Sequence, residues 1–179
     1  MVTDEHINII LENLEKTRDV EGDVVELGCN VGTTSIFIQE ALRGSMKRFH
    51  VYDSFEGVPK PEAIDETDFK KGAARTTKEA FVKTFSDQNI LLPEIHVGWF
   101  KDLEYPDKIS FAFFDGDFYS SITDSFEKVY PKMQKGGIIL VHDYGWERTK
   151  GVEKACTDFL KDKPEKMRSE SKIGIMVKL

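Results

Sequence analysis

Two apolar segments of the sequence each end in charged side chains. The stretch FAFFDGDFY carries Asp115 and Asp117, and the stretch IILVHDYG carries His142 and Asp143. If both segments are buried strands of one parallel sheet, their carboxyl ends lie at the same edge and these side chains converge. Oxygen-rich clusters suit a hard divalent cation, with Mg²⁺ the first choice. A cation there would lower the pKa of a bound hydroxyl and so prepare a nucleophile.

These residues also have ordinary structural interpretations. Asp117 stands just before the segment SSITDSF, where it could cap a helix, and the other two Asp residues could do the same. His142 could be a metal ligand, a general base near neutral pH, a partner of a ligand or an ordinary hydrogen-bonded histidine. We predict that Asp115, His142 and Asp143 are the catalytic and metal-binding residues.

A glycine-containing turn follows the first apolar strand. The stretch VVELGCNVGTT places Gly28 and Gly32 between a strand and a helix. Glycines let backbone approach a ligand closely, and the start of a helix favours a carboxylate or phosphate. Asn30 stands where the dinucleotide pattern GxGxxG requires glycine, so this turn does not match that pattern.

The charges around this turn indicate a cationic ligand with a ribose. Glu26 is an odd neighbour for a pyrophosphate but suits an ammonium group, and Asp53 lies about twenty residues beyond Gly32, where an acidic residue binds ribose hydroxyls. An ammonium, a carboxylate and a ribose occur together in S-adenosylmethionine; a plain strand–turn–helix is the alternative. Gly32→Val is expected to block the cofactor site and leave most of the fold intact.

Aromatic and charged residues flank the expected site. Trp99 and Trp146 are expected to form pocket walls, and so is Phe100, for which core packing is equally consistent. The charged run 65–71 is expected to be a solvated loop, with a substrate lid as the alternative. The remaining histidines have no motif around them and are expected to be structural or exposed: His6, His50 and His96.

Strand-like and helix-like segments alternate along the chain. Helical spacing is expected over 5–19, 33–42, 121–133 and 152–160, and Thr76 with Glu79 has the form of a capping box for a further helix. Strands are expected over 23–28, 49–53, 95–97, 111–114, 138–141 and 173–178, with Gly136-Gly137 as a turn. The alternation predicts an α/β fold with a mostly parallel sheet and helices on both faces.

Length and composition favour one soluble enzyme-sized domain over residues 1–179. The net charge is −7 and no basic run stands out, so nucleic acid is not an expected partner. No apolar stretch is long enough to span a bilayer and the N-terminus is not a signal peptide, so no membrane association is expected. Two cysteines are too few for a disulfide framework, which favours a cytoplasmic location.

Together these segments resemble the macrocin O-methyltransferase family, whose members methylate sugar hydroxyls of macrolides and related natural products. The resemblance runs from about residue 23 to residue 160 and rests on VVELGCNVG, VYDSFEGVP, GWFKD, FDGDFYSS and YPKMQKGGIILVHDYG. It implies a Rossmann-like class I methyltransferase with a seven-stranded sheet and a reversed last hairpin. It also implies S-adenosylmethionine as the donor and a magnesium-dependent hydroxyl acceptor.

The resemblance also implies roles for individual residues. Asp53 would bind the ribose, and Asp115, His142 and Asp143 match the metal positions. The residues that would contact the methionine end are Glu26, Gly28, Asn30, Gly32 and Thr34. Those that would flank the adenine are Ser54, Phe55, Trp99 and Phe100.

Two departures from the family pattern bear on these expectations. The family usually has Asp-Asp-Tyr-Gly where this chain has His142-Asp143-Tyr144-Gly145. An imidazole ligand would shift metal preference towards Mn²⁺, Fe²⁺ or Zn²⁺, or one ligand would be lost. The chain is also short at its N-terminus, which favours a smaller sugar-like acceptor over a macrolide.

The sequence therefore predicts a metal-dependent O-methyltransferase acting on a small hydroxylated molecule. The alternatives are a metal-dependent hydroxylase related to this family, an NAD-dependent oxidoreductase on a similar sheet and a non-catalytic binding domain. The acceptor, the metal and the oligomeric state, for which a homo-oligomer is allowed, are not specified by the sequence.

Overall fold

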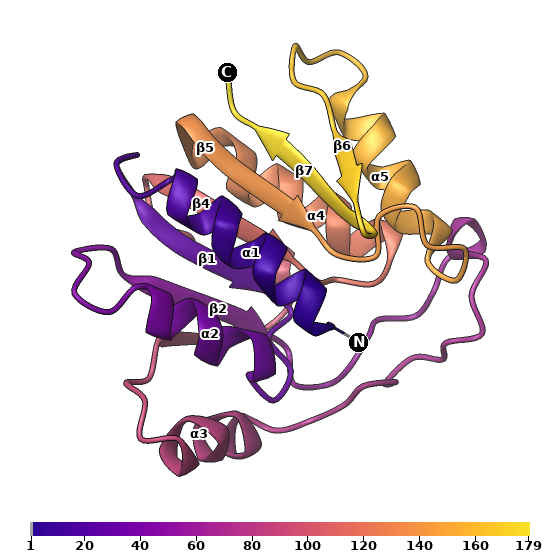
Figure 1. The fold of residues 1–179 in the computed structure, drawn as a ribbon. Coiled ribbons are helices and arrows are strands. Elements are labelled where there is room, and N and C mark those ends of the chain that lie inside the picture. The colour runs from indigo at the N-terminus through magenta and orange to yellow at the C-terminus, as the bar shows by residue number, and fades with distance from the viewer. Residues whose placement is uncertain (1) are drawn as a thin grey trace.

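The computed structural model describes residues 2–179, and the strands found there form one seven-stranded sheet (Figure 1). The strand order is β3-β2-β1-β4-β5-β7-β6. Neighbours from β3 to β5 are parallel, whereas β7 runs antiparallel to both β5 and β6. The bounds are β1 Asp23–Leu27, β2 Phe49–Asp53, β3 Glu94–Val97, β4 Ile109–Phe114, β5 Met133–Val141, β6 Arg168–Glu170 and β7 Ile173–Val177.

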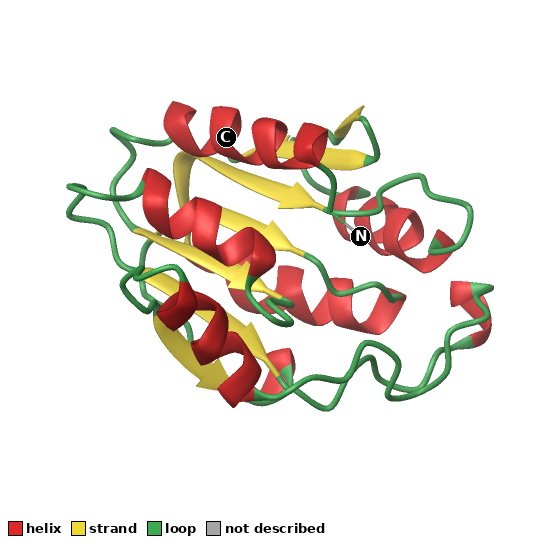
Figure 2. Cartoon of the chain, turned by 60° about the horizontal axis from the view of Figure 1, so that its bottom comes forward, coloured by secondary structure: helices red, strands yellow, loops and turns green. Residues whose placement is uncertain are grey.

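Helices cover both faces of this sheet, as Figures 1 and 2 show. Residues of α1, α2 and α3 pack with one face of the sheet, and residues of α4 and α5 pack with the other. The expected α/β architecture, with a mostly parallel sheet and a reversed last hairpin, is confirmed. The helices are α1 Asp4–Lys16, α2 Thr33–Ala41, α3 Lys78–Asp87, α4 Tyr119–Val129 and α5 Lys150–Leu160, with short 3₁₀ turns η1 Ala63–Asp65, η2 Phe100–Asp102 and η3 Tyr130–Lys132.

Alternation along the strands explains the two-sided core. In β1, Val24 belongs to the core on the α1–α3 face, and Val25 and Leu27 belong to the core on the α4–α5 face. Successive side chains of a strand point to opposite faces, so a central strand buried on both sides is apolar nearly throughout. All six residues of β4 are buried, which is why its sequence shows no polar alternation.

Three sequence expectations about the positions of a helix cap, a helix end and a turn were wrong. The N-cap of α3 is Thr77, whose side chain accepts a hydrogen bond from the Ala80 amide, so Thr76 and Glu79 do not form the expected capping box. The helix expected over 121–133 ends at Val129, and Met133 begins β5. Gly136 and Gly137 lie inside β5, where the register against β4 shifts, and a side chain at Gly137 would touch backbone oxygens. They form an irregularity within the strand, because only glycine allows this close approach.

A long irregular connection, residues 54–77, crosses the end of the sheet where the parallel strands finish. We call it the β2–α3 segment. Figures 1 and 2 show it leaving the tip of β2, reaching towards the start of α5 at η1 and returning to α3. The edge formed by the carboxyl ends of the parallel strands β1 to β5 is called the rim below. The β2–α3 segment lies beside the rim, as expected for either a solvated loop or a lid.

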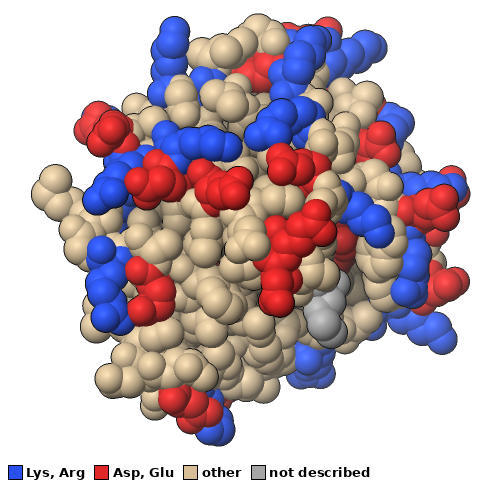
Figure 3. Space-filling model, in the orientation of Figure 1, with Lys and Arg blue, Asp and Glu red and all other residues tan. Residues whose placement is uncertain are grey.

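The surface carries charges of both signs. On the face drawn in Figure 3, Lys and Arg are interspersed with Asp and Glu, without a continuous basic stripe. Within residues 2–179, none of the helices combines the length and the apolar character that a bilayer crossing requires.

Candidate active site

Gly28 holds two strand ends in contact. It has a φ of 92°, which favours glycine, and its amide donates to the Tyr52 carbonyl at 2.8 Å. A Cβ built at Gly28 would lie 2.2 Å from the backbone oxygen of Asp115. The glycine therefore lets β1 and β4 approach closely at the point where the glycine turn and the acidic stretch both begin.

Asp53 supports the backbone of the glycine turn. Its Oδ2 accepts from the Asn30 amide at 2.8 Å, and its Oδ1 accepts from the Phe55 amide at 2.7 Å. Burial raises the pKa of Asp53, although the hydrogen bonds from these amides oppose the rise. Each carboxylate oxygen has a second lone pair, so the group can also accept from a ligand hydroxyl.

Asn30 connects the glycine turn to the β2–α3 segment. It adopts a left-handed backbone (φ 47°), which Asn tolerates, and its Nδ2 donates to the Ala74 carbonyl at 2.8 Å. Its Oδ1 accepts from the Val31 amide at 2.8 Å. The residue that replaces a glycine of the dinucleotide pattern thus joins the turn to the returning end of that segment.

Gly32 is the N-cap of α2, with a φ of 85° and no side chain to cap the helix. A Cβ at this position would lie 2.9 Å from the Phe81 ring and 3.1 Å from the Phe85 ring. A valine would therefore disturb the packing of α3, so the structure argues against the expectation that Gly32→Val leaves most of the fold intact. The free amides at the start of α2 remain suited to an anionic group.

Glu26 is almost completely buried, with 1% of its surface exposed. Its Oε2 accepts a hydrogen bond from the Ser35 hydroxyl of α2. Burial, together with the negative charges of Asp115 and Asp53, raises the pKa of Glu26 to about 8, against the opposing effect of Ser35. Thr34 is buried next to Ser35 at the first turn of the same helix.

The four residues expected to flank an adenine occupy different environments. Phe55 is buried among the core residues of the α1–α3 face, with its ring edge-on to Phe81. Phe100 packs against the opposite core, as its alternative interpretation predicted. Ser54 and Trp99 are half-buried at the ends of β2 and β3. Ser54 lies one residue beyond β2 and Trp99 lies two residues beyond β3, so both are at the rim.

His142 lies between the two expected acidic ligands. Its Nδ1 is 2.8 Å from Asp115 Oδ1 and 3.3 Å from Asp143 Oδ1. The nitrogen is buried and makes no hydrogen bond within residues 2–179. Burial disfavours the imidazolium, but the charges of Asp115 and Asp143 outweigh it, and the pKa of His142 is raised. The pKa of Asp143 is also raised, mainly by burial.

The other ring nitrogen of His142 contacts α1. His142 Nε2 lies 3.1 Å from His6 Nδ1, and His6 Nδ1 also accepts from the Thr3 amide at 3.4 Å. Because His6 Nδ1 acts as an acceptor, the proton belongs on His142 Nε2. His142 Nδ1, facing two carboxylates, must then carry a second proton or contact a cation. His6 had no sequence motif, and its role follows only from the tertiary contact.

Asp117 does not cap α4. The N-cap is Phe118, and Asp117 has a left-handed backbone (φ 61°). Burial, followed by the charges of Asp115 and Asp143, raises the pKa of Asp117 to about 7. The structure thus brings three carboxylates and an imidazole to the ends of β4 and β5.

The helix start for which Asp117 was one possible cap is held by Asp65 instead. Asp65 has no exposed surface, and its Oδ1 accepts from the Tyr119 amide at 2.7 Å, while its Oδ2 accepts from the Glu62 amide at 2.7 Å. A Cβ at Gly151 would lie 2.0 Å from Asp65 Oδ1, so the glycine leaves room for this carboxylate. Asp65 fixes the far end of the β2–α3 segment between α4 and α5. In sequence it looked like one charge of a solvated run.

Asp65→Ala is expected to destabilise the protein by about 1–3 kcal/mol, because it removes two hydrogen bonds to a charged group. The β2–α3 segment should become more susceptible to limited proteolysis, since its anchor is lost. Urea unfolding and timed trypsin digestion measure the two effects. The matched control is Asp68→Ala, at an exposed position three residues away. Equal stability and digestion of the two variants would contradict the anchoring role.

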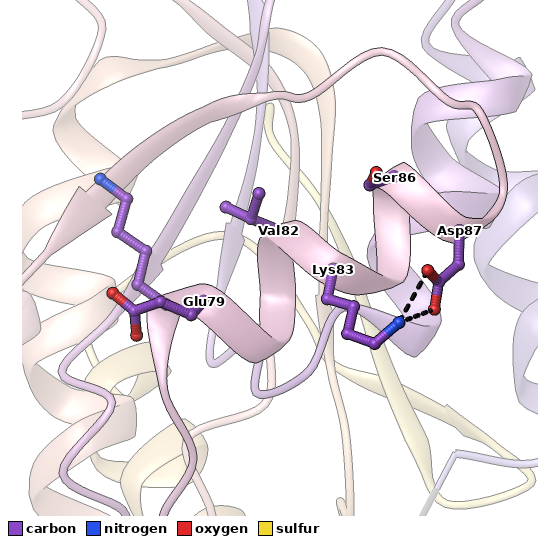
Figure 4. A pocket seen from close by; sticks show the side chains of 6 residues that line it. Glu79, Val82, Lys83, Ser86 and Asp87 are labelled. Carbon is purple, nitrogen blue, oxygen red and sulfur yellow. Dashed lines mark hydrogen bonds and ion pairs between the residues drawn. The ribbon is translucent and has the colours of Figure 1, made fainter.

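Two surface hollows lie away from these residues. Figure 4 shows one of them along the outer face of α3, lined by Lys78, Glu79, Val82, Lys83, Ser86 and Asp87. Lys83 pairs with Asp87 at 2.7 Å, both largely exposed, as on an ordinary solvated helix face. A second hollow lies around Asp23 and Lys108, at the opposite end of the strands from the rim. Neither hollow is lined by the candidate active-site residues at the rim.

Comparisons with known proteins give consistent results. The family model for macrocin-O-methyltransferase (TylF) matches residues 1–170. The 8-demethyl-8-(2,3-dimethoxy-alpha-L-rhamnosyl)-tetracenomycin-C 4'-O-methyltransferase of Streptomyces olivaceus is 30% identical over 158 residues, covering 80% of this chain and 58% of that protein. The demethyldecarbamoylnovobiocin O-methyltransferase of Streptomyces niveus is 29% identical over 163 residues, covering 78% of this chain and 62% of that protein.

The structure of the O-methyltransferase NovP superposes with a TM-score of 0.83 at 22% identity, over 97% of this chain and 79% of that one. This likeness identifies the fold as the Rossmann-like fold of class I methyltransferases. The chain spans less than two thirds of the length of the two curated relatives. Since the family model covers nearly the whole sequence, the chain belongs to the macrocin-O-methyltransferase family.

Proposed function

We propose that this chain transfers a methyl group from S-adenosylmethionine to a hydroxyl of a small sugar-like or natural-product acceptor. The observation that carries the proposal is the meeting, at one rim, of the glycine turn held by Asp53 and the acid–histidine cluster of Asp115, His142 and Asp143. The glycine turn is suited to binding a nucleoside with an amino-acid end. The acid–histidine cluster is suited to binding a hydroxyl that must lose its proton. The names of the curated relatives, which include a rhamnosyl substrate, support a sugar-like acceptor.

The chain's own residues would bind the donor as follows. Asp53 would accept from the ribose hydroxyls with the lone pairs that Asn30 and Phe55 leave free. The free amides at the start of α2 would receive the carboxylate, and Glu26 would attract the ammonium group. S-adenosylmethionine supplies the electrophilic methyl group, and the protein's contribution is orientation.

The donor set at the ends of β4 and β5 fits a divalent cation. Within residues 2–179, His142 Nδ1 is a buried nitrogen without a hydrogen bond, and its Nε2–H is directed to His6, so Nδ1 is the atom that would face a metal ion. Asp115, His142 and Asp143 would hold the ion, although within residues 2–179 they are not a group whose ligand atoms all lie within 4.8 Å of one another. When bound, such a cation lowers the pKa of an acceptor hydroxyl.

The β2–α3 segment would shield the acceptor from water. Asn30 holds its returning end at Ala74, and Asp65 holds its far end against α4. Residues 66–73 between these two anchors are exposed or half-buried and lie beside the rim. This part of the segment is therefore suited to contacting a substrate, and its charges favour a hydroxylated one.

Calorimetric titration with S-adenosylmethionine tests the donor site. The parent is expected to bind it, and Asp53→Ala is expected to weaken binding by about ten- to a hundredfold, since a charge-assisted hydrogen bond contributes roughly 1.5–3 kcal/mol. Glu56→Ala, an exposed carboxylate three residues away, is the matched control and should bind like the parent. Binding by Asp53→Ala as tight as that of Glu56→Ala would contradict the ribose assignment.

The acceptor is then sought by methyl incorporation. Purified protein, labelled S-adenosylmethionine and Mg²⁺ or Mn²⁺ are incubated with deoxysugars, nucleotide sugars, glycosylated aromatics and catechols. Label transferred to a sugar hydroxyl supports the proposal. Binding of NAD or of 2-oxoglutarate without binding of S-adenosylmethionine would favour an oxidoreductase or a hydroxylase instead.

A further inference from the structure

Three side chains that commonly bind metals meet at the edge of the sheet, away from the candidate active site. His50 lies on β2, and Glu94 and His96 lie on the edge strand β3. His50 Nδ1 is 3.1 Å from His96 Nε2 and 3.4 Å from Glu94 Oε2. Within residues 2–179, this is the one group of three or more His, Cys, Asp or Glu whose ligand atoms all lie within 4.8 Å of one another.

We propose that His50, Glu94 and His96 form a Zn²⁺ site. Two imidazoles and a carboxylate are a donor set that zinc prefers and that Mg²⁺ does not. In tetrahedral coordination with bonds of about 2.0–2.1 Å, neighbouring ligand atoms are separated by roughly 3.3 Å. The separations of 3.1 and 3.4 Å lie on either side of this value.

The parallel register of β2 and β3 produces the cluster. His50 is opposite Glu94 and Tyr52 is opposite His96, so these four side chains share one face of the sheet. The Tyr52 ring stacks on His96 with centroids 4.5 Å apart and planes 9° apart. This stacking fixes the orientation of the His96 ring before any ion is bound.

A carboxylate outside the cluster sets the protonation of His50. Asp23 Oδ2 lies 3.3 Å from His50 Nε2, and Arg48 donates to the same oxygen at 2.7 Å. The Arg48 backbone amide also donates to the other carboxylate oxygen of Asp23, Oδ1, at 3.1 Å, so both oxygens act as acceptors towards Arg48. An ionised carboxylate only accepts, so the proton lies on His50 Nε2 and the lone pair lies on Nδ1, towards His96 and Glu94. Metal-binding histidines commonly have such a carboxylate partner.

His96 and Glu94 can also donate electron pairs to a metal ion. His96 is half-buried, and its Nε2 faces His50 Nδ1. Arg48 approaches the Oε1 of Glu94 at 3.6 Å, which leaves Oε2 directed towards His50. An ion here would join the edge strand β3 to β2. It would thereby stabilise the strand that leads into Trp99 at the rim.

A hydrogen bond between the His50 and His96 rings also accounts for the 3.1 Å contact. Titration with Zn²⁺ alone distinguishes such a hydrogen bond from a metal site. The chelator-treated parent is titrated by calorimetry, and its thermal unfolding midpoint is measured with and without Zn²⁺. We expect binding at this site and a rise in the midpoint. His96→Gln and Glu94→Gln should lose the binding at this site and its share of the rise in the midpoint, and Asp23→Asn should bind Zn²⁺ there about 10–100-fold more weakly.

Two further variants separate this site from the rim. Asp115→Asn should keep the binding that Glu94→Gln loses, because the proposed site does not include the rim. Glu127→Gln, an exposed carboxylate on α4, should behave like the parent. Glu94 is itself exposed, so its variant is expected to fold, and circular dichroism in EDTA checks this. Identical Zn²⁺ isotherms and midpoints for the parent, Glu94→Gln and His96→Gln would overturn the proposal.

Discussion

Asp115→Asn and Asp143→Asn are each expected to lower methyl transfer by at least about a hundredfold. Both carboxylates flank His142 Nδ1, which makes no hydrogen bond within residues 2–179, and an amide has neither the charge to hold a cation nor the charge to balance an imidazolium. Asn fits the same volume, and it tolerates the left-handed backbone of Asp143 (φ 59°). Turnover is measured with the acceptor that the incorporation screen identifies, and thermal unfolding checks the fold.

Asp107→Asn provides the control, because this carboxylate is fully exposed at the opposite end of the sheet. EDTA should inactivate the parent, and added Mg²⁺ or Mn²⁺ should restore it. Glu94→Gln lacks the proposed zinc site, so inactivation of that variant by EDTA would place the required ion at the rim. A parent that keeps full turnover in EDTA, together with active Asp115 and Asp143 variants, would exclude the metal proposal.

The fold could be predicted because its sequence signals are local. A buried parallel strand needs apolar side chains on both faces, so the segment that forms β4 is recognisable from its composition. The carboxyl ends of such strands carry the ligands in this class of sheet, and this rule alone predicts that Asp53, Asp115 and His142 lie at one edge. The irregularity inside β5 was missed, because a glycine pair within a strand looks like a turn in sequence.

The contacts made by individual side chains could not be predicted in the same way. His6 reaches His142 from a helix 136 residues earlier in the chain, and nothing around it marks this. Asp65 appeared to be part of a charged surface run, yet it is completely buried. His50 and His96 meet only because β2 and β3 pair in one particular register. Each depends on tertiary geometry that local spacing does not encode.

The donor site and the β2–α3 segment share a hydrogen-bond chain. Asp53 accepts from the Asn30 amide, and the Asn30 side chain donates to Ala74 at the end of that segment. A ligand that orders the glycine turn would therefore also favour the ordered segment, because both depend on the position of Asn30. By the same reasoning, loss of the Asp65 anchor should weaken donor binding modestly, although Asp65 does not touch that site.

Glu26→Gln is expected to stabilise the protein at alkaline pH and to weaken donor binding. The pKa of Glu26 is raised to about 8 from an ordinary 4.5, chiefly by burial. Between these values the folded chain holds a proton that the unfolded chain has released, so the parent loses stability as the pH rises. The variant has no such proton. The difference in free energy of unfolding between Glu26→Gln and the parent should therefore shift in favour of the variant by about 3 kcal/mol between pH 5.5 and pH 8.5.

The affinity of the parent for the donor should change with pH in the opposite direction from its stability. Ionisation of Glu26 is expected to tighten binding of the ammonium group, so the affinity of the parent should rise with pH towards 8, whereas Glu26→Gln should show a smaller rise. At pH 8.5 the variant should bind S-adenosylmethionine about 10–100-fold more weakly than the parent. Urea unfolding and calorimetry at the two pH values measure both effects, with the exposed Glu127→Gln as the control. If Glu26→Gln and Glu127→Gln showed the same pH dependence in both measurements, Glu26 would be neither a strained buried acid nor the ammonium ligand. A change in stability alone would leave Glu26 as a buried acid that does not contact the donor.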